Sequence, residues 1–150
     1  MPSEPGGPRP GGGPVMIRGT VLYIEDNPTN VRLVARLLEQ RPGVRLISAD
    51  RGQLGLALAR EHRPNLTLLD LHLPDMKGSA VLRAIHQDPL LRQTPVIVLS
   101  GDMDPDLPTQ MLAGGAQAYL LKPFDSRQFF TAIDLSLSTG GPPDPTNVET

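Results

Sequence analysis

Residues 66–78 read Leu-Thr-Leu-Leu-Asp-Leu-His-Leu-Pro-Asp-Met-Lys-Gly. The first residues of this stretch are mostly apolar at consecutive positions, which is typical of a strand buried on both faces. An acidic residue, Asp70, stands at the end of the run. We therefore predict a buried strand at Leu66–Asp70 that delivers a carboxylate to one edge of a parallel sheet.

Four further runs of this kind alternate with stretches of helical periodicity. The predicted strands are Thr20–Ile24, Val44–Ser48, Leu66–Asp70, Val96–Ser100 and Ala118–Leu121. The predicted helices begin at Pro28, span Gly52–Glu61 and Ser79–Gln87, lie near Asp104–Ala113, and begin at Asp125. The alternation predicts an α/β fold with helices on both faces of a parallel sheet. With right-handed crossovers, the simplest topology is the flavodoxin-like (βα)5 doubly wound sheet with strand order 2-1-3-4-5.

Local signals refine the helices. Apolar spacing predicts that the second helix turns three side chains inward: Leu54, Ala57 and Leu58. Pro108 lacks a backbone donor, so we expect the fourth helix to begin near it or to have a distorted first turn. Asp125 and Gln128 are spaced as in a capping box at the start of the fifth helix.

The ends of the chain differ from its middle in composition. Residues 1–15 and 139–150 are rich in Pro and Gly, which predicts a disordered N-terminal segment and a flexible tail around one domain at 16–138. A net charge of -2 points to neither nucleic acid nor an anionic membrane. The absence of Cys excludes disulfides and thiolate chemistry, no apolar run approaches a membrane span, and we expect a cytoplasmic protein.

Polar side chains follow four of the predicted strands. Glu25 and Asp26 end the first, Asp70 the third and Ser100 the fourth, and Lys122 follows the fifth. Because the carboxyl ends of parallel strands share one edge, these side chains should converge there. Three carboxylates about 4 Å apart repel one another by roughly 4 kcal/mol per pair at an effective dielectric near 20, which a divalent cation would relieve. Two carboxylates, a carbonyl and waters suit Mg²⁺.

The same set can perform phosphoryl transfer. Asp70 is placed to act as a nucleophile, since aspartyl phosphates are known covalent intermediates. Ser100 can hydrogen-bond one phosphoryl oxygen, and Lys122 can neutralise another. Each residue alone has an ordinary explanation; Glu25 and Asp26, for example, could simply cap the first helix. The prediction rests on their coincidence at one edge.

In these motifs the sequence resembles the receiver domains of two-component response regulators, over about Thr20 to Leu137. The motifs are Tyr-Ile-Glu-Asp-Asn-Pro at 23–28, Leu-Leu-Asp-Leu-His-Leu-Pro-Asp-Met-Lys-Gly at 68–78 and Tyr-Leu-Leu-Lys-Pro-Phe at 119–124. The stretch at 24–30 is most similar to receivers attached to, or working beside, hybrid sensor kinases.

The resemblance implies roles for individual residues. It implies phosphorylation of Asp70, Mg²⁺ bound by Asp26, Asp70 and the backbone carbonyl of His72, and Glu25 acting through water. It further implies that Ser100 and Tyr119 act as the switch pair. The residues that match the loops shaping the site are Pro74, Gly78 and Pro123.

The sequence also departs from the common receiver pattern. Glu25 stands where many receivers have Asp, and Lys77 stands where an acid is common. His72 and Asp102 occupy positions that affect the phosphoryl lifetime in the family. These departures concern rates rather than the type of chemistry.

The resemblance implies that the chain is a signalling domain rather than a dedicated enzyme, although such a domain catalyses its own phosphorylation and dephosphorylation. The donor would be a histidine kinase or a histidine phosphotransfer protein, and the output a contact with an unknown protein target through the fourth helix, fifth strand and fifth helix. Relatives that dimerise through this face carry paired acids where this chain has Gln117 and Ala118, so we expect a monomer.

Three alternatives remain at this point. A flavin or nucleotide site needs a loop of backbone amides after the first strand, whereas Glu25 and Asp26 repel phosphate. An Asp-nucleophile phosphatase of the haloacid-dehalogenase type would have a second Asp where this chain has His72. A receiver-like scaffold that signals without phosphorylation is the third.

Overall fold

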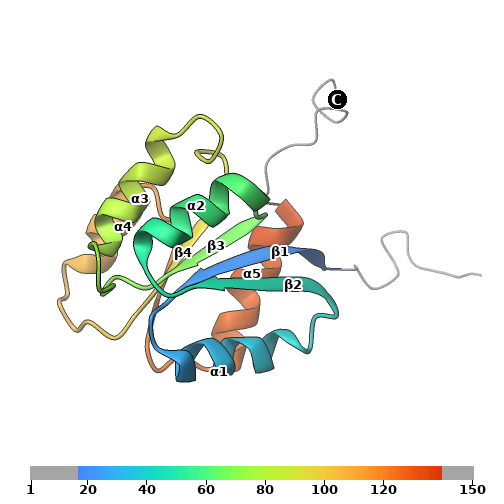
Figure 1. Ribbon diagram of the computed structural model, residues 1–150. Helices are drawn as coiled ribbons and strands as arrows, with labels where there is room; N and C mark the ends of the chain where they lie inside the picture. The colour runs from blue at the N-terminus through green and yellow to red at the C-terminus, as the bar shows by residue number, and fades with distance from the viewer. Residues whose placement is uncertain (1–16, 140–150) are drawn as a thin grey trace, which may run out of the picture.

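The computed structural model describes residues 17–139, in which strands and helices alternate throughout (Figure 1). The strands are β1 (Arg18–Ile24), β2 (Gly43–Ala49), β3 (Leu66–Leu69), β4 (Val96–Ser100) and β5 (Ala118–Leu121). The helices are α1 (Pro28–Leu38), α2 (Gly52–His62), α3 (Gly78–Gln87), α4 (Leu107–Ala113) and α5 (Ser126–Thr139). The segment predicted at 1–15, and all but the first residue of the tail predicted at 139–150, lie outside the described residues.

The five strands form one parallel sheet in the order β2-β1-β3-β4-β5, which confirms the predicted topology. β2 lies on one side of β1, whereas β3, β4 and β5 follow on its other side, so the order of the strands switches between β1 and β3. These two strands are hydrogen-bonded neighbours with Val21 opposite Leu66. In doubly wound sheets, the crevice beyond the carboxyl ends at this switch point is the usual ligand site.

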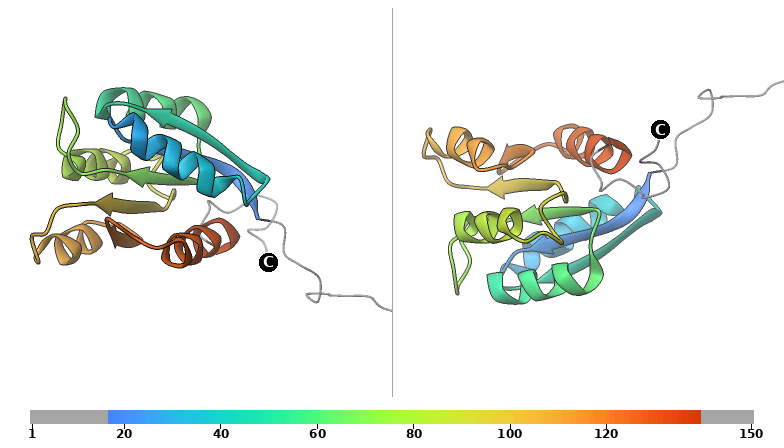
Figure 2. Two further views of the ribbon diagram at one scale, coloured as in Figure 1. Left: turned by 90° about the horizontal axis from the view of Figure 1, so that it is seen from below. Right: turned by 90° about the horizontal axis from the view of Figure 1, so that it is seen from above.

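Helices cover both faces of the sheet (Figure 2). Side chains alternate along β1: Leu22 and Ile24 pack with α2, α3 and α4, whereas Val21 and Tyr23 pack with α1 and α5. All four are at most 1% exposed. Burial on both faces explains why the strand is apolar at consecutive positions rather than alternately.

The predicted inward face of α2 is only partly right, because Leu58 packs against the core but the other two residues do not define the buried face. Ala57 is exposed and Leu54 only half-buried, while the helix buries a neighbouring face: Gly52, Gly55, Leu56 and Ala59. A Cβ on Gly55 would lie 2.5 Å from the Cδ1 atom of Ile24, so the missing side chain lets α2 approach β1 closely. The spacing of apolar side chains does not reveal this face, because two of its four residues are glycines.

The predicted start of α4 and the predicted capping box at the start of α5 are confirmed. α4 begins at Leu107, next to Pro108, and not at Asp104. Before α5, the Asp125 carboxylate accepts from the Gln128 backbone N–H at 2.7 Å, and the Gln128 side chain accepts from the Asp125 N–H at 3.2 Å. Within residues 17–139, no helix combines the length and the apolar character that crossing a membrane requires.

Candidate active site

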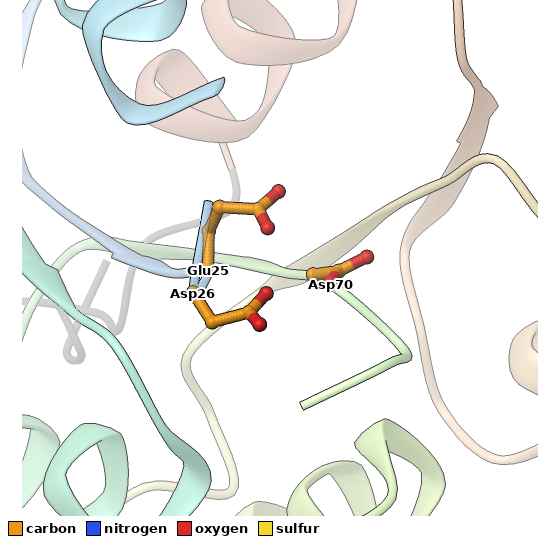
Figure 3. A group of neighbouring side chains, drawn as sticks. All are labelled: Glu25, Asp26 and Asp70. Carbon is orange, nitrogen blue, oxygen red and sulfur yellow. The ribbon is translucent and has the colours of Figure 1, made fainter. Parts of the chain in front are cut away.

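The predicted site residues meet at the carboxyl edge of the sheet. Figure 3 shows Glu25 and Asp26, just after β1, beside Asp70, just after β3. One carboxylate oxygen from each of these three residues lies within 4.8 Å of the others. Ser100 ends β4 and Lys122 follows β5 at the same edge. Such a set of hard oxygen donors fits Mg²⁺, which suits carboxylate and carbonyl ligands completed by water.

Glu25 is held by four donors. Its Oε1 atom accepts from the Tyr23 hydroxyl and Lys122 Nζ, each at 2.9 Å, and from Asn30 Nδ2 at 3.2 Å. Its Oε2 atom accepts from the Asn27 N–H at 3.2 Å. Burial opposes ionisation of this side chain, which is 3% exposed, but the hydrogen bond and charge of Lys122 hold the pKa of Glu25 below its ordinary value. Glu25 is therefore an anchored anion.

Neither Glu25 nor Asp26 accounts for the cap of α1. The N-cap is Asn27, whose side chain accepts from the Thr29 N–H at 2.8 Å, with Pro28 in the first turn. Helix capping therefore does not explain the two acids just before Asn27. The Asp26 side chain is exposed, unlike those of Glu25 and Asp70, and leaves the end of β1 in a different direction from Glu25 (Figure 3).

Asp70 has the opposite electrostatic environment from Glu25. It is 6% exposed, and this burial, helped by the charges of Glu25 and Asp26, raises the pKa of Asp70 to about 6 even though Lys122 opposes the shift. Lys122 Nζ lies 3.6 Å from Asp70 Oδ1, farther than its 2.9 Å from Glu25. Lys122 therefore lies between the two buried acids and stabilises Glu25 more strongly.

Ser100 connects the site to the loop that follows β4. Its side chain is fully buried, and its Oγ atom accepts from the Asp102 N–H at 3.0 Å. The Asp102 carboxylate in turn lies 3.0 Å from His72 Nε2, across the gap between the β3–α3 and β4–α4 loops. The Asp104 N–H, aided by His72, holds the pKa of Asp102 below its ordinary value. The hydroxyl and both loops thus form one chain of contacts.

The β3–α3 loop, which includes His72 and Pro74, is fixed by Gly78 and Asp75. A Cβ on Gly78 would lie 2.6 Å from the Leu71 Cα, so only glycine fits. The Asp75 carboxylate accepts from the Gly52 N–H at 2.7 Å and the Gln53 N–H at 2.9 Å, so it caps α2 in place of Arg51, which makes no side-chain cap bond. These backbone bonds hold the pKa of Asp75 below its ordinary value.

The remaining predicted residues lie on β5 and just after it. Tyr119 is half-buried against the α2–α3–α4 core, and its hydroxyl is buried without a hydrogen-bond partner in the part of the chain that the structure describes. The Lys122–Pro123 peptide bond is cis.

Sequence reasoning missed three residues of this region. Tyr23 was assigned no role, although its position two residues before Glu25 on a strand puts both side chains on one face. Asn30 lies one helical turn after the acids and carried no signal of its own. Asp75 contacts α2 more than twenty residues away, a pairing that no local pattern reveals.

A doubly wound sheet with three acids, a buried hydroxyl and a lysine at its carboxyl edge belongs to a class of domains suited to phosphoryl chemistry. Residues 21–134 match the family model described as the response regulator receiver domain. The chain belongs to this family, which works in phosphorelay signalling.

Individual relatives agree with this assignment. The polar-differentiation response regulator DivK of Brucella anthropi is 35% identical over 76% of this chain and 92% of its own length. The cell cycle transcriptional regulator CtrA of Caulobacter vibrioides is 34% identical over 75% of this chain, but only 48% of CtrA is matched. The receiver domain of a sensor histidine kinase from Pseudomonas aeruginosa, solved with a magnesium ion coordinated in its active-site cleft, is 25% identical. It has a TM-score of 0.73 over 81% of this chain and 99% of its own.

Receiver domains bind Mg²⁺ at their acidic site and interact with histidine kinases or phosphotransfer proteins. The flavin and phosphatase alternatives are not favoured, because the family and the acidic edge agree on a receiver.

Proposed function

We propose that this chain accepts a phosphoryl group on Asp70 from a phosphohistidine donor. The observation that carries the proposal is a nearly buried carboxylate with a lysine ammonium at 3.6 Å and two further acids close by. In the transfer, an Asp70 oxygen attacks phosphorus, the phosphorus–nitrogen bond breaks, and the donor imidazole leaves with the bonding electrons. Water later attacks the same phosphorus and releases the Asp70 carboxylate.

Mg²⁺ belongs to this proposal. Asp26, Asp70 and the backbone carbonyl of His72 would hold the ion directly, with Glu25 acting through a water molecule. When bound, the ion would neutralise charge on the phosphoryl oxygens. It would also offset the repulsion among the three carboxylates, whose oxygens lie within 4.8 Å of one another.

Ser100 and Lys122 would hold the transferred group. Ser100 would exchange its bond from the Asp102 N–H for a hydrogen bond to a phosphoryl oxygen, and Lys122 would turn from Glu25 toward the new charge. Movement of Ser100 would make room for Tyr119, whose buried hydroxyl lacks a partner within residues 17–139. Phosphorylation would thereby favour a second state of the α4–β5–α5 face.

We further propose the setting in which the domain works. The donor is a histidine kinase or a histidine phosphotransfer protein, the output is a protein contact, and the compartment is the cytoplasm. The functional unit is the receiver at residues 16–138, and it works as a monomer.

Acetyl phosphate with Mg²⁺ tests the proposal without knowledge of the donor. Intact-protein mass spectrometry should detect one added phosphoryl group on the wild type, and none on Asp70→Asn. Asp50→Asn is the matched control, because Asp50 is an exposed acid that pairs with its neighbour Arg51. Equal phosphorylation of Asp70→Asn and wild type would refute Asp70 as the acceptor, and no phosphorylation of any variant would favour the scaffold alternative.

A further inference from the structure

Tyr23 joins the hydrophobic core to the acidic site. It is 1% exposed and packs in the core cluster that includes Val34 and Phe129. Its hydroxyl donates to Glu25 Oε1 at 2.9 Å. Because a carboxylate oxygen accepts, the Tyr23 hydroxyl is the donor in this bond. One side chain thus has an apolar ring and a polar tip aimed at the site.

The donors to Glu25 are divided unequally between its two oxygens. Oε1 accepts from Tyr23, Asn30 and Lys122, whereas among residues 17–139 only the Asn27 N–H donates to Oε2. Since a carboxylate oxygen has about two lone-pair directions, Oε1 is saturated and Oε2 retains an open position. Donors on both oxygens also fix the rotation of the carboxylate.

A glutamate needs such fixing more than an aspartate does. Its extra methylene adds a rotatable bond, and ordering a glutamate side chain costs up to about 2 kcal/mol of conformational entropy. Asn30 and Lys122 come from outside the strand, while Tyr23 stands on β1 itself and reaches Oε1 from the core. Tyr23 is therefore the donor whose position is set by the sheet.

We propose that Tyr23 is a positioning residue of the metal site. Its hydroxyl locks Glu25 so that Oε2 remains available to a metal-bound water, and it shares Oε1 with Lys122 so that the ammonium can turn to Asp70. This inference rests on the proposed function, because it assigns Glu25 the water-mediated role at Mg²⁺.

Tyr23→Phe separates this role from core packing, because it keeps the ring and removes only the hydroxyl. Isothermal titration of the unphosphorylated full chain with Mg²⁺ should give about tenfold weaker binding, the lower end of what loss of an outer-shell partner costs. Ser136→Ala is the control: it removes another hydroxyl from a residue 1% exposed, in α5, and should leave the affinity within about twofold of wild type. Wild-type affinity in Tyr23→Phe would overturn the inference.

A double-mutant cycle adds a readout that a purely structural role would not change. Glu25→Asp shortens the carboxylate by one methylene and withdraws it from the tyrosine, so Tyr23→Phe should then have an effect below about twofold. An equal loss in both backgrounds would mean that Tyr23 acts through the fold, and would overturn the inference.

A third measurement uses the intact Tyr23. The chain has two tyrosines and no tryptophan, so Tyr119→Phe leaves Tyr23 as the sole tyrosine. Its ring NMR signals should shift on addition of Mg²⁺, and unchanged signals at saturating Mg²⁺ would contradict the inference even if Tyr23→Phe does not fold. The two proposals can fail separately: a wild type that does not bind Mg²⁺ would overturn both, whereas a wild type that binds it while Tyr23→Phe binds equally well would overturn only the role of Tyr23.

Discussion

At the scale of single residues, the surroundings of the two buried acids shift their pKa values in opposite directions. The pKa of Glu25 is lowered, despite its burial, because Lys122 and Tyr23 donate to it, whereas Asp70 has Lys122 only at 3.6 Å and lies beside two other acids. Ionised Asp70 is thus poorly stabilised by the protein alone. A carboxylate in that state gains most from a nearby cation.

This environment predicts an unusual dependence of stability on pH. The pKa of Asp70 rises from the ordinary 3.8 to about 6 on folding. Between these values the folded protein keeps a proton that the unfolded chain loses, so the free energy of unfolding falls as pH rises through the window. Asp70→Asn should therefore raise the free energy of unfolding in metal-free buffer near pH 7 by about 1–3 kcal/mol.

Urea denaturation near neutral pH and at about pH 3 or below checks this prediction. The gain in Asp70→Asn should vanish at the lower pH, where both states of the wild type are protonated. Asp50→Asn serves as the control with an exposed acid and should show no such gain. A destabilised Asp70→Asn near neutral pH would contradict the assigned environment.

Asp26 should contribute more to metal affinity than to stability. Its side chain is exposed, so Asp26→Ala leaves no cavity and no unpaired buried charge. Loss of a direct carboxylate ligand should weaken Mg²⁺ binding by more than about tenfold in calorimetric titration. Unchanged affinity would mean that Asp26 is not a ligand and would shift the direct role to Glu25.

At the scale of elements, the strands were predictable and the contacts between loops were not. β4 and β5 have the predicted bounds, because strands buried on both faces leave an unbroken apolar run. The site residues at the strand ends followed from the same pattern. The buried face of α2 did not, because Gly52 and Gly55 mark close approach rather than bulk. The bonds from the Gly52 and Gln53 N–H groups to Asp75 depend on tertiary geometry that a residue pattern does not contain.

The hydrogen bonds by which Asp75 clips the β3–α3 loop to the start of α2 lead to a prediction. Asp75→Ala removes the acceptor for the Gly52 and Gln53 N–H groups, and the helix offers no cap of its own. We expect faster amide hydrogen exchange at these two residues, with slow exchange retained in the middle of α2. Asp75→Asn keeps one acceptor oxygen and should lie between the wild type and Asp75→Ala. Unchanged exchange in Asp75→Ala would show that the clip does not hold the loop.

At the scale of the whole molecule, the described α4–β5–α5 face has no pair of acids just before Tyr119 that could bridge two copies. Gln117 and Ala118 are neutral, and Asp134 on α5 is already bound within the chain. Arg41 donates to the two carboxylate oxygens of Asp134 at 2.8 and 2.7 Å. The Arg41 guanidinium also lies 4.3 Å from the centre of the Phe130 ring. The face also exposes Leu112 on α4 and Leu121 on β5, which suits a different protein partner.

These features predict a monomer before and after activation. Beryllofluoride with Mg²⁺ should produce the activated state at Asp70 without a change in mass. Analytical ultracentrifugation at micromolar protein measures this directly. A clear shift to the dimer mass on activation would contradict the prediction and would indicate association through apolar contacts alone.

The central claim is that Asp70 is the residue that becomes phosphorylated. After incubation with acetyl phosphate and Mg²⁺, borohydride converts an aspartyl phosphate into homoserine, which peptide mass spectrometry locates in the sequence. Homoserine at position 70, absent when acetyl phosphate is omitted, is the predicted result. Homoserine at position 26 or at any other aspartate, with position 70 unchanged, would contradict the account.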